Sequence, residues 1–292
     1  MNPKRFLATI VLAAAAGLSG CSNQETPAQP AAIDMTEMKQ NLQILARARV
    51  LFGHQSVGRD LLAGVEQLAR DAGVALRIQR IEGTPPDDEP GLFHSEVGEN
   101  RNPDSKCEVF EQLLDRPERP AYDLAMMKFC YVDLGRGSSA EADSMLRRYA
   151  ATVERIRETR PDVQLVHLTL PLRAEPPGKK TRLKRLLGME VDSDHDNALR
   201  NEFNRRLRET WADEPMFDLA SVESTLPDGT RVTYEHDGQA MNMLAQAYTN
   251  DGGHLNELGQ RHAAAEFVRV LADTLRRAPR QTDVEQLTQA AE

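Results

Sequence analysis

Three side chains with the chemistry of a serine hydrolase stand far apart in this 292-residue sequence. Asp251 and His254 share the segment "DGGH", whereas Ser56 lies in "FGHQSVG", almost 200 residues earlier. An imidazole held by a carboxylate can take the proton of a serine hydroxyl, which turns that hydroxyl into a nucleophile toward acyl carbons. The two glycines between Asp251 and His254 allow a sharp turn. One rigid segment would thus supply both the acid and the base.

Ser56 stands where a parallel sheet would expose a nucleophile. It follows the apolar run 49–54, "RVLFGH", which predicts a buried strand, and it precedes a helical pattern that starts at Val57. Active sites in such sheets lie at the carboxyl ends of the strands. Backbone N–H groups at a helix start can also stabilise an oxyanion.

Helix capping is the structural alternative for these residues. A serine at this position is a good N-cap for the helix that follows. Asn250 and Asp251 could likewise cap the last helix, with His254 merely in its first turn. Both interpretations of each segment stay open at this point.

The body of the chain alternates short apolar runs with helical patterns. The predicted strands cover 49–54, 74–81, 122–132, 163–170 and 216–220. The predicted helices cover 57–70, 139–160 and 197–211, and the last one starts near 254. Residues 82–106 are rich in Pro and Gly and predict an irregular segment. The alternation predicts one α/β domain, a three-layer α/β/α sandwich with a parallel, flavodoxin-like sheet.

An early Ser combined with a late Asp-x-x-His resembles the SGNH/GDSL hydrolase superfamily. The resemblance covers roughly residues 45–275 and implies the SGNH hydrolase fold. It also implies that Ser56 is the nucleophile, that His254 is the general base and acid, and that Asp251 orients His254. In α/β-hydrolases the nucleophile instead follows several strands, and the acidic residue and the histidine are usually far apart.

The sequence departs from the family pattern around the oxyanion. The first block reads Gly53-His54-Gln55-Ser56 where the family has Gly-Asp-Ser. The third block, Gly-x-Asn-Asp in the family, aligns with "CYVD", which retains Asp133 but places Val132 at the Asn. Loss of one oxyanion donor typically costs about 3–4 kcal/mol in the transition state. Other groups must therefore donate if the protein is an efficient enzyme.

Several residues are candidates for oxyanion or substrate contacts. The second block of the family needs a Gly, which "SEVGENRN" offers as Gly98, with Asn100 as a possible substitute side-chain donor. The Ser56 N–H, Lys128 and Lys106 are further candidates. His54 either touches substrate beside Ser56 or is packed inside the fold.

The N-terminus predicts export and lipidation. A basic start and the apolar run "FLATIVLAAAAGLSG" make residues 1–20 a signal peptide, too short for a membrane span. The sequence "LSGC" resembles the lipobox of bacterial lipoproteins, which implies a lipidated Cys21, and Ser22 after it favours the outer membrane by the same resemblance. Residues 21–41 predict a flexible tether, 42–277 the folded domain, and 278–292 a polar tail.

Composition narrows the classes of partner. The net charge of −9 argues against nucleic acid. Neither a Gly-rich phosphate loop nor a Cys/His zinc spacing is present, and the triad works without a metal or cofactor. The acidic cluster 192–196 predicts a helix start rather than a metal site. The basic segment 178–188 predicts a solvated helix, with a lid or a surface for acidic substrates as the alternatives. The pairing of Cys107 with Cys130 and the oligomeric state stay open.

Together, the resemblances to SGNH/GDSL hydrolases and to bacterial lipoproteins imply a lipid-anchored acyl-ester hydrolase of the cell envelope, on the periplasmic face of the outer membrane. The expected substrates are small acyl esters, acetylated polysaccharides or lipid esters. Two alternatives remain. An O-acyltransferase would use the same triad, whereas a non-catalytic lipoprotein would keep the fold to bind a glycan or a protein partner.

Overall fold

A parallel sheet forms the centre of the protein. The computed structural model describes residues 33–81, 88–115, 121–135, 137–187, 189 and 191–277. Five parallel strands run in the order β2-β3-β1-β4-β5. Their bounds are Arg49–His54 for β1, Ile78–Arg80 for β2, Gly91–Glu96 for β3, Leu124–Met127 for β4 and Gln164–Leu165 for β5. This sheet confirms the predicted α/β class.

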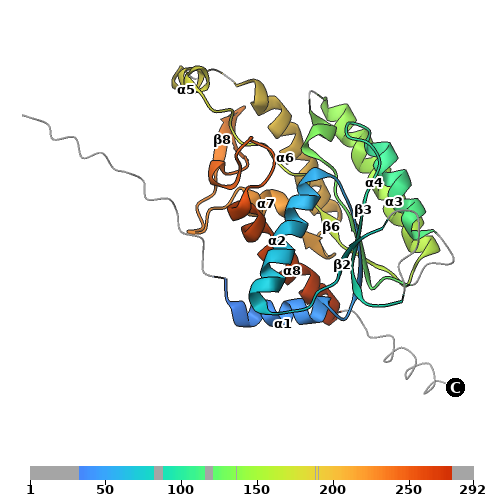
Figure 1. The fold of residues 1–292 in the computed structure, drawn as a ribbon. Helices are drawn as coiled ribbons and strands as arrows, with labels where there is room; N and C mark the ends of the chain where they lie inside the picture. The colour runs from blue at the N-terminus through green and yellow to red at the C-terminus, as the bar shows by residue number, and fades with distance from the viewer. Residues whose placement is uncertain are drawn as a thin grey trace, which may run out of the picture.

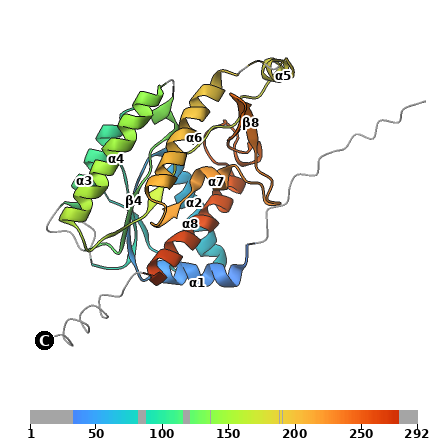
Figure 2. The ribbon, with the colours of Figure 1, turned by 180° about the vertical axis from the view of Figure 1, so that it is seen from behind.

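Helices cover both faces of the sheet. Their bounds are Met35–Leu45 (α1), Ser56–Ala72 (α2), Pro103–Leu114 (α3), Ser139–Thr159 (α4), Lys179–Leu186 (α5), Asp192–Thr210 (α6), Leu219–Glu223 (α7) and Glu257–Arg277 (α8). One layer contains α1, α2 and α8, and the other contains α3, α4 and α6 (Figures 1 and 2). The three predicted layers are therefore present.

Smaller elements complete the described chain. Strand β6 (His167–Leu168) pairs with β7 (Met216–Phe217), and β8 (Thr233–His236) forms a hairpin with β9 (Gln239–Asn242). Two short 3-10 helices are η1 (Tyr131–Leu134) and η2 (Gln246–Tyr248). None of the helices in the described ranges combines the length and the apolar character that a membrane span requires.

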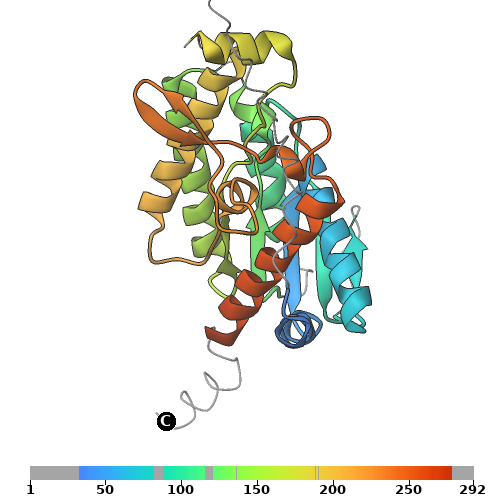
Figure 3. The ribbon, with the colours of Figure 1, turned by 90° about the vertical axis from the view of Figure 1, so that its left-hand side faces the viewer.

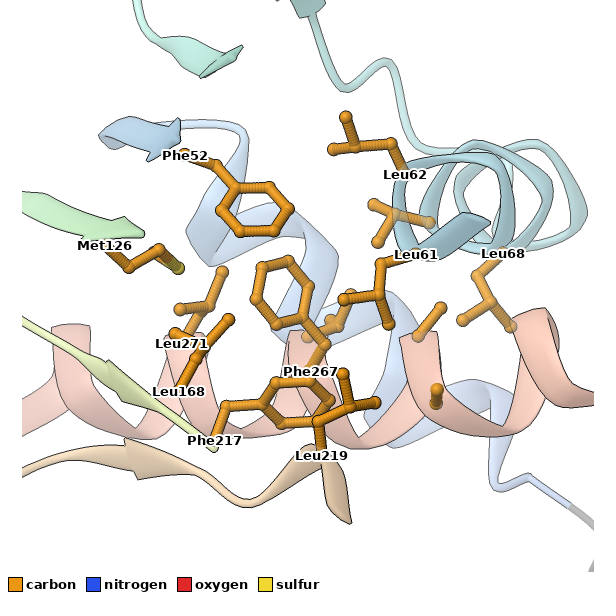
Figure 4. Close-up of a cluster of buried hydrophobic side chains, with 14 of the residues drawn as sticks. Phe52, Leu61, Leu62, Leu68, Met126, Leu168, Phe217, Leu219, Phe267 and Leu271 are labelled. Carbon is orange, nitrogen blue, oxygen red and sulfur yellow. The ribbon is translucent and has the colours of Figure 1, made fainter. Parts of the chain in front are cut away.

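Each face of the sheet has its own hydrophobic core. In the core under α2 and α8, Phe52 of β1 contacts Phe267 of α8, with ring centroids 5.5 Å apart (Figure 4). Gly64 lets these two helices approach closely, because a Cβ there would collide with the backbone carbonyl of Gln260. Cys107 lies in the other core, and both Cys107 and Cys130 are buried free thiols. The close helix contact joins the middle of α2 to the start of α8.

Several sequence-based expectations were wrong in part, among them the strand expected over 163–170, which is divided between β5 and β6 in two sheets. The first helix, α1, begins at Met35 inside the expected tether, because Met38 and Leu42 pack into the core beside α8. The segment expected to be irregular contains β3, which pairs with β1 along six residues. The strand expected over 216–220 ends at Phe217, because Asp218 caps α7.

The path of the chain diverges at the end of β1. From β1 the chain moves through α2 toward β2 on one side, and from β4 it moves through α4 toward β5 on the other. Ligands of open α/β sheets bind at the carboxyl ends of strands, where the connections diverge in this way. The segments that follow β1 and β4 therefore border the expected binding crevice.

Candidate active site

Ser56 is the first residue of α2, directly after β1. The N-cap of this helix is Gln55, so Ser56 does not cap it. The Gln55 side chain instead donates from Nε2 to the carbonyls of Val97 (2.9 Å) and Gly98 (2.8 Å), which joins the end of β1 to the turn after β3. Ser56 is half-buried, and its hydroxyl has no hydrogen-bond partner within the described part of the chain. That hydroxyl can therefore meet a substrate.

Asp251 and His254 form a hydrogen-bonded pair on one turn. Nδ1 of His254 lies 2.6 Å from Oδ2 of Asp251, while Oδ1 of Asp251 accepts from the backbone N–H of Gly253 and His254. Partial burial raises the pKa of Asp251, but these three hydrogen bonds outweigh it and hold that pKa far below its ordinary value. Asp251 therefore stays ionised and accepts the Nδ1 proton, which leaves Nε2 of His254 as the basic nitrogen.

Asp60 holds this turn against α2. Its Oδ2 accepts from the backbone N–H of Leu255, the residue after His254, at 3.0 Å. Residues four apart share a helix face, so Asp60 lies one turn below Ser56 on the same side of α2. Burial raises the pKa of Asp60, although the Leu255 N–H and the charge of His254 oppose this. The contact brings the Asp-x-x-His turn to the start of α2.

The structure does not join Ser56 and His254 by a hydrogen bond. Catalytic hydrogen bonds in ligand-free sites are often long and tighten only when substrate binds. His254 is 41% exposed at its side chain, so solvent and substrate can reach it.

Tyr131 lines the site beside His254, a role that no sequence pattern indicated. Its ring meets the imidazole edge-on, with centroids 5.9 Å apart. Gly253 makes room for it, because a Cβ there would collide with the Tyr131 ring. The guanidinium of Arg173 lies over the face of the Tyr131 ring, 5.3 Å from its centroid. Tyr131 and Arg173 thus extend the wall of the site outward from His254.

Gly98, the predicted oxyanion donor, lies in a bend two residues after β3. It has a φ of 53°, and a Cβ would collide with the backbone N of Lys106. Within the described part of the chain its N–H has no acceptor, whereas its carbonyl accepts from Gln55. Asn100 is exposed, and its Oδ1 accepts from Lys106 Nζ at 3.1 Å. Among these candidates, the Gly98 N–H, the Asn100 Nδ2 and the N–H groups of Ser56 and Val57 have no acceptor within the described part of the chain.

A buried ion pair supports this loop from below. Lys106 Nζ lies 2.6 Å from Asp133 Oδ2, and both side chains are fully buried. Asp133 also accepts from the backbone N–H of Arg101 (2.8 Å) and Cys130 (2.7 Å). Asp133 therefore links the segments after β3 and β4.

Asp133→Asn is expected to lower the free energy of unfolding by about 3–5 kcal/mol, because it leaves the ammonium of Lys106 buried without its carboxylate. Urea unfolding at pH 7 measures this change. Asp143→Asn is the matched control, because Asp143 forms an ion pair with Arg206 in which each side chain is 36% exposed. This variant should lower the free energy of unfolding by less than about 1 kcal/mol. Equal losses for the two variants would contradict a special role for the buried pair.

His54 is packed inside the fold. Its Nδ1 lies 2.8 Å from the carbonyl of Gln55, and its Nε2 lies 3.0 Å from Nδ1 of His94. Because a carbonyl only accepts, His54 carries its proton on Nδ1 and accepts from His94 at Nε2. Burial lowers the pKa of His54 to about 3, so it stays neutral. A Cβ on Gly58 would collide with the His54 ring, which explains the glycine.

Lys128 is also fully buried and makes no direct approach to the surface. Its Nζ donates to the carbonyl of Phe129 at 2.9 Å, and burial lowers its pKa. Glu223 of α7 interacts electrostatically with Lys128. One oxygen of Glu223, Oε1, accepts from the backbone N–H of Leu172. The other, Oε2, is buried and has no hydrogen-bond partner among the described residues. Burial raises the pKa of Glu223 to about 8. Glu223 is therefore mostly protonated near neutral pH.

Glu223→Gln is expected to flatten the pH dependence of stability. The pKa of Glu223 is about 8 in the fold, against 4.5 ordinarily, so its stabilising contribution is complete below pH 4.5 and is lost as the pH rises through 8. The free energy of unfolding of the variant, taken relative to that of the wild type, should rise by about 2–4 kcal/mol from pH 5 to pH 9. Urea unfolding at both pH values tests this, with the exposed Glu235→Gln as control. Parallel profiles for wild type and Glu223→Gln would contradict the prediction.

Comparisons with known proteins give the chain no family. No family model and no curated protein matches it. Among solved structures, a mutant acetyl esterase with acetate is similar at 12% identity and a TM-score of 0.46, over 78% of this chain and 98% of that one. An acetyl xylan esterase is similar at 13% identity and a TM-score of 0.42, over 76% of this chain and 99% of that one. The periplasmic domain of a lipopolysaccharide acetyltransferase from Salmonella ser. Paratyphi A is similar at 10% identity and a TM-score of 0.39. The similarity covers 82% of this chain and 90% of that one. Scores of this size do not carry an assignment of activity.

Among the described residues, no group of three or more His, Cys, Asp or Glu side chains is arranged to hold a metal ion. Ser56 follows the carboxyl end of β1, and Asp251 and His254 lie on the turn before α8, whereas His54 and Lys128 are buried in the interior. Asp60, Tyr131 and Arg173 join the site from three separate segments of the chain.

Proposed function

We propose that the chain is a serine-dependent acyl-ester hydrolase. The observation that carries the proposal is the 2.6 Å hydrogen bond between Asp251 and His254, on a turn that docks through Leu255 and Asp60 against α2. The first residue of that helix is Ser56. A carboxylate, an imidazole and a hydroxyl at the carboxyl end of a parallel sheet are the groups that acyl transfer requires.

The reaction follows from the roles of these groups. Ser56 Oγ attacks the carbonyl carbon of the ester while Nε2 of His254 takes the hydroxyl proton. The oxyanion receives hydrogen bonds from the Gly98 N–H and from the start of α2. As the C–O bond breaks, His254 gives its proton to the departing alcohol. Water then attacks the acyl-serine, with His254 again as base, and releases the acid and the free Ser56. Asp251 stabilises the imidazolium in both steps.

Labelling with a fluorophosphonate tests the nucleophile directly. The probe should modify Ser56, as mapped by mass spectrometry, and Ser56→Ala and His254→Ala should abolish labelling while circular dichroism shows intact folding. Ser95→Ala is the matched control, because Ser95 is half-buried and lies opposite Gly53 in the neighbouring strand. An unlabelled but folded wild-type protein would favour the binding lipoprotein over the hydrolase.

We also propose that the chain is anchored in the cell envelope through a lipid on Cys21. The motif "LSGC" after an apolar export segment supports this. Stable anchoring takes more than one acyl chain or a second signal. Cys21→Ser should move the protein from the membrane fraction to the soluble fraction and remove incorporation of labelled palmitate. Retention of the variant in membranes would contradict lipidation at Cys21. Acetylated glycans and lipid esters of the envelope are accordingly the first substrates to test.

A further inference from the structure

An exposed guanidinium stands at the wall of the site beside His254. Arg173 lies over the face of Tyr131, whose edge meets the imidazole of His254. Its Nε donates to the carbonyl of Gly252 at 3.3 Å, within the Asp-x-x-His turn itself. A single aromatic ring therefore separates the positive charge of Arg173 from the base.

The backbone of Arg173 is held firmly by α6. Asn197 accepts from the Arg173 N–H at 3.0 Å and donates to the Arg173 carbonyl at 2.7 Å. Arg200, itself 2% exposed, donates from Nη1 to the same Asn197 and from Nε to the carbonyl of Tyr131. Two buried side chains of one helix thus fix both Arg173 and the ring on which it rests.

A basic helix follows Arg173 in the sequence. Residues 174–178, which include Glu175, connect Arg173 to α5, whose sequence "KKTRLKRL" is entirely basic among its charged residues. This helix projects at the end of the molecule where α2 and α8 begin (Figures 1 and 3). The whole chain carries a net charge of −9, so a helix of this composition is an exception, although Glu175 and Asp196 add negative charge to the same region. The carboxylate of Asp251 is hydrogen-bonded to His254.

The position of Arg173 indicates which part of an ester it would meet. His254 protonates the departing alcohol, so the alcohol part lies on its side of the site, whereas the oxyanion donors lie on the side of Gly98 and α2. A guanidinium binds carboxylates and phosphates through paired N–H groups. We propose that Arg173 forms a subsite for an anionic group, a carboxylate or a phosphate, on the alcohol part of the substrate. This inference rests on the proposed hydrolase function.

Matched acetate esters test the subsite by selectivity. The full-length protein, purified in detergent, is assayed with phenyl acetate, 4-acetoxybenzoate and 4-acetoxyphenyl phosphate. The wild type should have a higher kcat/KM for an anionic ester than for phenyl acetate. Arg173→Gln should lower the ratio of these two kcat/KM values at least tenfold. The two anionic esters distinguish a carboxylate from a phosphate site. Arg173→Lys should restore part of the ratio, while the distant and exposed Arg70→Gln should not change it. An unchanged ratio in Arg173→Gln would overturn the subsite.

A binding measurement separates failure of the subsite from failure of the hydrolase. Ser56→Ala protein is titrated by calorimetry with 4-acetamidobenzoate and with neutral acetanilide, which are amides of the same shape. The anionic amide should bind at least tenfold more tightly, and adding Arg173→Gln should remove the difference. Equal affinities would overturn the anion subsite even if esters are hydrolysed. An affinity difference without any ester hydrolysis by the wild type would support the subsite and refute the hydrolase.

Discussion

Ser56→Ala is expected to lower kcat for phenyl acetate by a factor of about 10⁴ or more, and His254→Ala by a similar factor. Without the hydroxyl no acyl-enzyme forms, and without the imidazole the hydroxyl keeps its proton. Because the two groups act as one unit, the double variant should be about as slow as either single variant. Steady-state hydrolysis by the purified full-length chain measures all three.

The exposed His195→Ala provides the control for loss of a histidine and should keep wild-type rates. Multiplying effects in the double variant would show that Ser56 and His254 act independently. Retention of more than a tenth of the wild-type rate by Ser56→Ala would assign the hydrolysis to another nucleophile.

Asp251→Asn should lower kcat by a factor of about 10² to 10⁴ while it leaves KM almost unchanged. The amide Oδ1 can still accept from the N–H groups of Gly253 and His254, so the turn should persist. The amide nitrogen, however, donates where the carboxylate accepted, which favours the tautomer with the proton on Nε2. That tautomer cannot take the proton of Ser56.

Separate kcat and KM values, together with urea unfolding, distinguish this effect from loss of the turn. Asp237→Asn is the control, because Asp237 is 94% exposed. A decrease in kcat below threefold would mean that His254 works without its carboxylate.

The sequence was most informative where local patterns dominate. The run 49–54 matches β1 because a central strand is buried on both faces and so is continuously apolar. The helices expected over 57–70 and 139–160 agree with α2 and α4 to within two residues. The candidate triad was also visible, because its acid and base share one short segment.

Elements that depend on distant partners were missed. Strand β3 lies within a Pro- and Gly-rich stretch, and only its pairing with β1 makes it a strand. Helix α1 has a polar sequence whose burial depends on α8, including a hydrogen bond from Arg276 to Asn41. Neither partner is close in sequence, so no local pattern could indicate them.

The same reason explains the missed site residues. Asp60 is an ordinary helix residue until the backbone of Leu255 reaches it from 195 positions away. Tyr131 looks like part of the apolar run after β4, and Arg173 like a loop residue. The two roles considered for His54 also needed coordinates, since only the bond to His94 and full burial show that it faces inward.

The two buried thiols affect how the protein can be produced. Cys107 and Cys130 are not cross-linked, and burial raises the pKa of Cys107 to about 11. At pH 7 only about one Cys107 in 10⁴ would be the reactive thiolate, so oxidants should modify it very slowly. Neither core depends on a covalent bond between these cysteines. The native fold therefore needs no disulfide between them, whereas both thiols are exposed in the unfolded chain and should be kept reduced during refolding.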